Sequence, residues 1–259
     1  MARVAAVLAL FWALLWAAAA TPAAAQYLVT EPCMGPCPQG TGTLANQVIV
    51  RPAYTLSNNP VTKFADWIAY AVDARNFGPS RPRDWRADPD LPASATLEPD
   101  DYRDAAATLK TDRGHQAPLA SFAGMESWAT TNYLSNITPQ ARALNQGPWV
   151  RLETAVRSLA SRSGAAVHVV TGPLYERPMP PLPRADEPHT IPSGYFKIVV
   201  LGRGRSVTAF IMDQTLERNA DFCATRVAMY EVEARTRLIF FPGSEAIGDP
   251  AEAVAALGC

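Results

Sequence analysis

The chain has 259 residues, and its 23 Lys and Arg against 24 Asp and Glu give a formal net charge of −1. A protein that coats nucleic acid over its whole surface carries a strongly basic field, so this near balance excludes that class. It leaves room for a locally positive cleft in an enzyme that has to release its product. Arginine supplies 20 of the basic residues, a skew that genome composition explains as well as phosphate binding does.

Residues 1–25 have the pattern of a secretory signal peptide. Arg3 precedes an apolar run from Val4 to Ala20, and Ala23-Ala24-Ala25 offers a small-residue cleavage site before Gln26. A membrane anchor is the competing interpretation, but the run is short, alanine-rich and ends at Thr21-Pro22. We expect export to the periplasm or out of the cell, with no membrane association of the mature form. The mature chain, residues 26–259, has the size of a single domain.

The four cysteines of an exported chain are expected to form two disulfides. Turn-forming residues separate Cys33 from Cys37, which favours a short local bridge and leaves Cys223 to pair with Cys259. A zinc site is the rival interpretation. It is disfavoured because no histidine lies near the first pair and the second pair is widely separated.

Six segments rich in β-branched and aromatic residues are predicted strands: 48–50, 54–56, 64–72, 166–171, 195–201 and 207–212. The proline-rich segments 76–99 and 178–192 are expected to be loops. Gly202-Arg203-Gly204 lacks the third glycine of a dinucleotide-binding fingerprint, so it is interpreted as a hairpin turn between the last two strands.

The clearest predicted helix covers 146–161, with Asn145 as its N-cap and Pro148 in the first turn. Its apolar side chains, Trp149, Leu152, Val156 and Leu159, gather on one side of a helical wheel. Further helices are predicted over 100–109, capped by aspartates, and over 222–235. Strands and helices mixed without βαβ regularity indicate an α+β fold.

The segment Asp112-Arg113-Gly114-His115 is followed thirty residues later by Asn145. Together these residues supply a base, a phosphate-binding arginine and an amide oxygen for a hard cation, which suits metal-assisted cleavage of a phosphodiester. The sequence contains neither a Gly-x-Ser-x-Gly elbow nor a His-Glu-x-x-His helix, so serine hydrolases and zinc proteases are disfavoured.

At these residues the chain resembles the Serratia-type non-specific DNA/RNA endonucleases of the ββα-metal fold, also called His-Me finger nucleases. The likeness runs through 54–59, 112–120, 132–140, 144–153, 171–177, 189–192 and 221–223. It implies a central antiparallel sheet flanked by helices, with a ββα-metal motif at the active site. It also implies DNA and RNA as substrates, and it is compatible with a homodimer.

The resemblance assigns the central chemistry to three residues. His115 corresponds to the general base, and an imidazole with an ordinary pKa near 6.5 suits that role. Asn145 corresponds to the single protein ligand of Mg2+, with Mn2+ as an alternative cation. Its alternative role is purely structural, as the N-cap of the helix. Glu153 would hold a metal-bound water, against the alternative of an ordinary surface carboxylate.

The resemblance also implies residues that contact the substrate phosphate. Arg83 matches the guanidinium that stabilises charge on the phosphate, and Arg113 and Arg157 would assist it. An ion pair with Glu153 is the alternative for Arg157. Asn132 and Asn136 match positions bordering the site, where amides orient the histidine or bind phosphate. The other histidines, His168 and His189, are assigned to structure.

These residues predict a secreted nuclease that hydrolyses both DNA and RNA and leaves 5′-phosphate ends, because contacts with phosphate and sugar carry little base information. Two alternatives remain open. One is a secreted nucleic-acid-binding or interaction protein that keeps the scaffold without catalysis. The other is a nuclease restricted to RNA or to one form of DNA.

Overall fold

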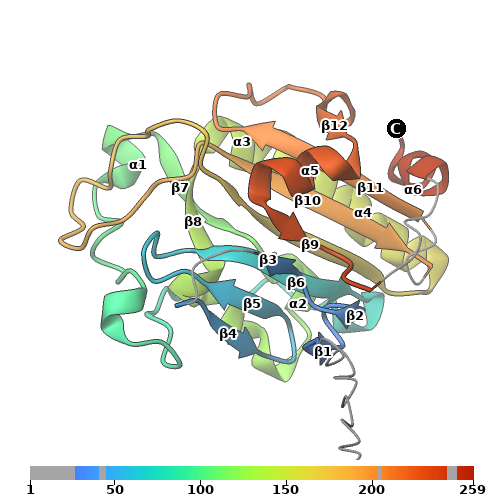
Figure 1. The fold of residues 1–259 in the computed structure, drawn as a ribbon, viewed down its shortest axis with the longest axis horizontal. Helices are drawn as coiled ribbons and strands as arrows, with labels where there is room; N and C mark the ends of the chain where they lie inside the picture. The colour runs from blue at the N-terminus through green and yellow to red at the C-terminus, as the bar shows by residue number, and fades with distance from the viewer. Residues whose placement is uncertain (1–26, 41–44, 203–205, 244–249) are drawn as a thin grey trace, which may run out of the picture.

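The computed structural model describes residues 27–40, 45–202, 206–243 and 250–259. The predicted signal peptide lies outside these residues, as do Arg203 and Gly204 of the predicted turn. Figure 1 shows a broad sheet with helices packed against it. This arrangement confirms the α+β fold with a central antiparallel sheet flanked by helices.

The central sheet has seven strands in the order β12-β11-β10-β9-β6-β5-β4, and each strand is antiparallel to its neighbours. The strands are β4 (Gln47–Val50), β5 (Thr55–Asn58), β6 (Ala65–Val72), β9 (Val167–Leu174), β10 (Gly194–Leu201), β11 (Ser206–Asp213) and β12 (Arg226–Val227). All six predicted strands are present in it. Gly194–Leu201 pairs with Ser206–Asp213 in hairpin register, as the predicted turn requires.

The central strands are buried on both faces, so their sequences are apolar throughout rather than alternating. On β10, Tyr195 and Val199 belong to the core on one side of the sheet, whereas Phe196 and Ile198 belong to the core on the other. Helices α4 (Val150–Ser163) and α6 (Pro250–Leu257) contribute to the first core. Helix α5 (Met229–Thr236) and strand β13 (Leu238–Ile239) contribute to the second. Figure 1 views the sheet from the side of α5.

A separate two-stranded hairpin carries the Asp-Arg-Gly-His segment. Strand β7 (Thr111–His115) pairs with β8 (Ile137–Ala141), so that His115 lies opposite Ile137. A helical run follows β8 directly and completes a ββα unit. Neither strand was predicted, and β7 is polar and lacks the apolar alternation of a half-buried strand. Gly114 is favoured here, because a Cβ at this position would lie 2.7 Å from the Cβ atom of Gln140.

The helical run after β8 starts earlier than predicted. It consists of α3 (Arg142–Leu144), a wide turn η5 (Asn145–Trp149) and α4. Asn145 has helical angles (φ −58°, ψ −48°) inside this run, so the prediction that it is the N-cap of a helix is wrong. The run is distorted at Gly147 (φ −117°, ψ −119°), where a Cβ would lie 2.5 Å from the carbonyl oxygen of Arg218. A wide turn of this kind is frequent at functional sites.

Two other predicted helices are shorter than expected. Of 100–109, only α1 (Ala105–Thr108) is helical, and the preceding Asp104 makes no capping hydrogen bond. The segment 222–235 is divided into η6 (Phe222–Thr225), β12 and α5, because β12 pairs with β11 instead of continuing a helix. The remaining short elements are β1 (Val29–Thr30), β2 (Gly35–Pro36), β3 (Gln39–Gly40), η1 (Ala74–Asn76), η2 (Ala93–Ala95), α2 (Leu119–Phe122), η3 (Glu126–Asn132) and η4 (Leu134–Asn136).

The structure contains both expected disulfides. Cys33 and Cys37 close the β1–β2 hairpin with an S–S distance of 2.12 Å. Cys223 and Cys259 join η6 to the end of the chain after α6 with an S–S distance of 2.07 Å. Within the described part of the chain, no helix has the length and apolarity needed to cross a membrane.

Candidate active site

An open cleft of about 630 Å³ lies between the end of β7, the η5 turn, the first half of α4 and the loop around residue 83. Six of the eight residues singled out for catalysis and binding line it together: Arg83, Arg113, His115, Asn145, Glu153 and Arg157. The hairpin and the helical run thus bring residues from four separate segments to one place.

His115, the last residue of β7, is held by Asn132. Its Nε2 atom lies 3.2 Å from Asn132 Oδ1, and Asn132 Nδ2 donates to the carbonyl oxygen of Pro82 at 3.1 Å. The Pro82 carbonyl can only accept, which fixes the orientation of the amide, so the hydrogen of His115 lies on Nε2. Nδ1 is left with the free lone pair. Asn132 thus contacts the histidine ring, and it is not among the residues that line the cleft.

Burial lowers the pKa of His115 to about 4, and the nearby Arg83 guanidinium acts in the same direction, whereas the hydrogen bond with Asn132 opposes both. The imidazole is therefore neutral at neutral pH and able to accept a proton. Its ring also packs against Trp85, with centroids 5.2 Å apart. These contacts restrict the ring to one position at the wall of the cleft.

The side chain of Asn145 is oriented by Asp112. Asn145 Nδ2 donates to Asp112 Oδ2 at 2.9 Å, and Gln146 Nε2 donates to the same oxygen at 2.8 Å. Because the amide nitrogen is committed to Asp112, the amide oxygen is free to serve as a neutral ligand. One amide oxygen with nearby carboxylates suits a hard, water-keeping cation such as Mg2+.

Glu153 lies on α4. Its side chain is only 10% exposed, so it is not an ordinary surface carboxylate. Burial raises its pKa, and the charges of Lys197 and Arg157 oppose that effect. Its ion-pair partner is Lys197, whose Nζ lies 3.4 Å from Glu153 Oε1. Arg157 instead donates to Thr154 Oγ1 at 2.8 Å, and among the described residues it forms no direct ion pair with Glu153, although its charge still acts on the Glu153 carboxylate.

Arginines dominate the charge of the cleft. Four of them line it, Arg83, Arg113, Arg157 and Arg218, against the two carboxylates Asp112 and Glu153. Arg83 is exposed at the rim. Arg113 is more enclosed, because it lies over the Tyr102 ring at 5.2 Å and donates to the carbonyl oxygen of Pro99 at 2.9 Å. Burial lowers its pKa. The cleft is thus locally positive in a chain without net positive charge.

Asn136 does not reach the cleft. Its side chain is fully buried, donates to the carbonyl oxygens of Ala117 and Thr131, and accepts from the amide of Ala117. A direct part of Asn136 in catalysis stays a prediction, and in this structure its side chain lies behind the residues that line the cleft. It fastens the segment that follows His115, and its burial leaves no room for a glycan at the sequon Asn136-Ile137-Thr138.

The two other histidines lie away from the cleft. His189 accepts from the amide of Leu182 at 3.0 Å and lies 2.8 Å from the carbonyl oxygen of Glu187, so it organises the 178–192 loop. His168 lies within β9. Their positions agree with the structural roles expected for them.

Sequence reasoning missed two residues of this region. Arg218 lines the cleft. The only hint in the sequence was Gly147, whose missing side chain lets the backbone at Arg218 pack directly against it. Lys197 lies directly behind Glu153, and its signal was a lysine inside the apolar strand 195–201. Neither signal identifies a partner without the tertiary structure.

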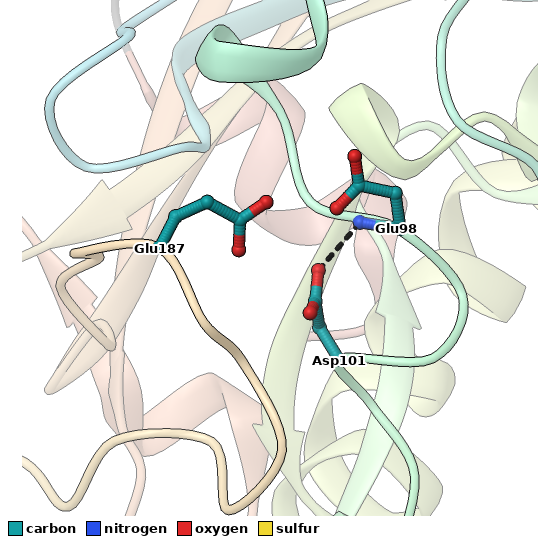
Figure 2. Close-up of side chains that lie close together, drawn as sticks. All are labelled: Glu98, Asp101 and Glu187. Atoms are coloured by element: carbon teal, nitrogen blue, oxygen red, sulfur yellow. Dashed lines mark hydrogen bonds between the residues drawn. The ribbon is translucent and has the colours of Figure 1, made fainter.

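A cluster of three carboxylates, Glu98, Asp101 and Glu187, lies outside the cleft lining. Their ligand atoms lie within 4.8 Å of one another, and Figure 2 shows the side chains converging from two loops. Asp101 Oδ2 accepts from the amide of Glu98 at 2.6 Å. Burial and the neighbouring Glu187 raise the pKa of Glu98 to about 7. The group could hold a metal ion, but it contains none of the residues that line the cleft.

Comparison with known proteins agrees with this site. The family model of the DNA/RNA non-specific endonucleases matches residues 37–246. A nuclease of Serratia marcescens is 49% identical over 215 residues, covering 82% of this chain and 80% of that protein. Human mitochondrial endonuclease G is 34% identical over 161 residues, covering 61% of this chain and 50% of that protein.

Among solved structures, the crystal structure of an EndoG/EndoGI complex matches with a TM-score of 0.66 at 22% identity, covering 76% of this chain and 86% of that chain. The shared fold is that of the ββα-metal nucleases. The chain belongs to the family of DNA/RNA non-specific endonucleases. It is therefore a nuclease, and this membership argues against the alternative of a binding protein without catalysis.

Proposed function

We propose that this nuclease hydrolyses phosphodiester bonds of both DNA and RNA with Mg2+ and leaves 5′-phosphate ends. The observation that carries the proposal is the cleft shared by His115, with its hydrogen on Nε2, and Asn145, with its amide oxygen free. A base and a neutral cation ligand at one positive cleft suit in-line attack of water on a phosphate.

In this mechanism His115 Nδ1 takes a proton from the attacking water. Asn145 would hold the cation through its amide oxygen, and a bound cation would supply electrostatic stabilisation of the charge on the leaving 3′-oxygen. Arg83, Arg113 and Arg157 stabilise the charge that develops on the phosphate, because a guanidinium group binds phosphate without exchanging a proton. Glu153 orients solvent at the wall of the cleft, and the leaving 3′-oxygen takes a proton from this solvent as its bond to phosphorus breaks.

Recognition through phosphate explains why both sugars are accepted. The positively charged groups of the cleft are guanidinium groups, which suit contact with phosphate and carry little information about base or sugar. A nuclease restricted to one nucleic acid needs contacts that read the 2′-hydroxyl or the base edges. The broader substrate range is therefore favoured.

Digestion of plasmid DNA, linear duplex DNA and RNA, side by side, tests this function. We expect cleavage of all three with Mg2+, none with excess EDTA, and recovery when Mg2+ is added back, with Mn2+ as a second cation. Full activity in excess EDTA would remove Asn145 from its assigned role. Cleavage of RNA alone, or of one DNA form alone, would replace the broad substrate range with a restricted one.

The mature protein is further proposed to be exported, as one domain spanning 26–259, and to form a homodimer. The two disulfides suit an oxidising compartment, although some relatives are mitochondrial proteins. Cell fractionation with N-terminal sequencing tests export and cleavage before Gln26.

Light scattering on the purified protein tests the dimer, and a monomeric mass would reject it. A single cooperative unfolding transition is expected of one domain.

A further inference from the structure

Lys197 is a buried cation in the apolar layer between the sheet and α4. It lies on β10 between Tyr195 and Val199, which both belong to the core on that side. Its side chain is 1% exposed. Burying an ammonium group costs several kcal/mol unless its partners compensate, so a lysine at this position requires an explanation.

The partners of Lys197 come from three other elements. Its Nζ lies 3.4 Å from Glu153 Oε1 on α4 and 3.3 Å from the Tyr70 hydroxyl on β6. It also lies 3.9 Å from the ring centroid of Trp149, at the end of η5, which favours a cation over the ring face. Among the described residues, Glu153 is its one carboxylate partner within ion-pair distance.

Glu153 connects this buried cation to the active site. The carboxylate lines the cleft, whereas Lys197 lies behind it and does not. The charged and titratable groups that act on Glu153 or lie beside it are Lys197 from β10, Arg157 from α4 and the Tyr70 hydroxyl from β6. Lys197 is the group that approaches from the side away from substrate.

We propose that Lys197 is a positioning residue for the nuclease reaction, whose ammonium group keeps the Glu153 carboxylate ionised and held at the cleft wall. This inference rests on the proposed function of Glu153 in orienting solvent. Lys197 touches neither substrate nor the reacting atoms, so its effect on the rate passes through Glu153. A role confined to packing β10 against β6 and α4 is the alternative.

The electrostatics of the pair agree with this role. Burial raises the pKa of Glu153, and among the neighbouring charges Lys197 opposes this effect most strongly. Burial lowers the pKa of Lys197 to about 8, against the attraction of Glu153. Each group therefore favours the charged form of the other, and the loss of one leaves the other unpaired in a low-dielectric layer.

A double-mutant cycle tests the inference on the full mature enzyme with Mg2+. The variants are Lys197→Met, which keeps the chain length without the charge, Glu153→Gln, and the two combined. We expect each single substitution to lower kcat/KM by about 10- to 100-fold. The double variant should remain within about threefold of Glu153→Gln, because Lys197 has no carboxylate left to position.

The pH profile gives a readout that a packing role would not move. Without its counter-cation Glu153 should become harder to ionise, so the acid limb of kcat/KM in Lys197→Met should move to higher pH by about 1–3 units. Activity lost at neutral pH should then return in part at higher pH. Lys197→Arg retains a cation and should keep the acid limb close to that of the wild type.

Lys63 provides a matched control, because it is also a buried lysine but forms no ion pair with a carboxylate of the described residues. Its side chain donates to the carbonyl oxygens of Pro60 and Ser94, each at 2.6 Å. Lys63→Met should lower the melting temperature and leave both kcat/KM per folded molecule and its pH profile unchanged. Folded fractions are measured by circular dichroism for every variant.

Additive effects would overturn the inference: Lys197→Met would then lower the rate of Glu153→Gln by the same factor as it lowers the rate of the wild type. If Lys197→Met does not fold, the double variant is compared with Glu153→Gln instead, because the double variant has no uncompensated charge. Equal rates of these two variants would support the inference, and a lower rate of the double variant would reject it. A wild type that needs no metal ion overturns the proposed function and this inference together. Additivity in a metal-dependent wild type overturns the inference alone.

Discussion

Asp112 accepts a hydrogen bond at 2.9 Å from the side-chain amide of Asn145, which lies 33 residues further along the chain. The bond joins the first residue of the Asp-Arg-Gly-His segment to the proposed cation ligand. It turns the amide nitrogen of Asn145 toward Asp112 and leaves the oxygen for a cation. The geometry of the proposed cation site therefore depends on a residue of the preceding hairpin.

Asp112→Ala should weaken the cation site without removing its ligand. With the amide of Asn145 no longer oriented, we expect the Mg2+ concentration for half-maximal rate to rise by about 10- to 100-fold. Cleavage rates over a Mg2+ titration measure this. Asp100→Ala, at an exposed aspartate beside Arg103, is the control and should leave the titration unchanged. An unaltered Mg2+ dependence in Asp112→Ala would separate Asp112 from the cation site.

His115→Ala should abolish cleavage and change the melting temperature at pH 7 only slightly. The imidazole is half-buried and contacts Trp85 and Asn132, so its loss affects the chemistry more than the packing. Single-turnover cleavage and thermal unfolding of the same preparation measure the two effects. If the variant kept a tenth or more of the wild-type rate, the base would have to be another group.

Glu98→Gln should stabilise the protein at alkaline pH. The folded-state pKa of Glu98 is raised to about 7, so its contribution is fully present below the unfolded pKa and is lost as the pH rises toward 7. With solvent screening taken into account, we expect Glu98→Gln to raise the free energy of unfolding by about 1 kcal/mol at pH 8 and to leave it unchanged at pH 4. Unfolding in EDTA at both pH values measures it, with exposed Glu217→Gln as control. An equal gain at both pH values would exclude protonation as its cause.

Removal of the two disulfides should destabilise the protein unequally. In the chain-entropy model the Cys223–Cys259 bridge, with a separation of 36 residues, contributes about 4 kcal/mol, and the Cys33–Cys37 bridge, with a separation of 4, about 2 kcal/mol. Paired Cys→Ser variants, compared by denaturant unfolding, measure both contributions. The opposite order would show that constraint of the unfolded chain is not the dominant effect.

The long strands β6, β9 and β10 were predicted correctly because they are buried in the middle of the sheet and are therefore mostly apolar. The hairpin of β7 and β8 escaped prediction for the opposite reason. Its first strand, Thr111–His115, is polar and is held by pairing with Ile137–Ala141 and by contact between Gly114 and Gln140. A strand that exists to present functional side chains carries no hydrophobic period.

The helix after this hairpin shows the same limit. Local capping preference favours Asn145 as a helix start, but the run begins at Arg142 because β8 leads directly into α3. Likewise, 222–235 has a helical pattern, yet β11 takes residues Arg226–Val227 into the sheet. In the second segment a long-range pairing thus overrides the local propensity.

The amino-acid sequence by itself determined the chemical groups of this protein: an imidazole, an amide, a carboxylate and several guanidinium groups, in an order that identifies the family. Only the tertiary structure decided which of these groups meet and in which state. It placed Asn136 behind the site, set the tautomer of His115 through Asn132, and paired Glu153 with Lys197. The physical reason is that side-chain identity is local, whereas hydrogen-bond geometry, burial and charge pairing depend on segments that only folding brings together.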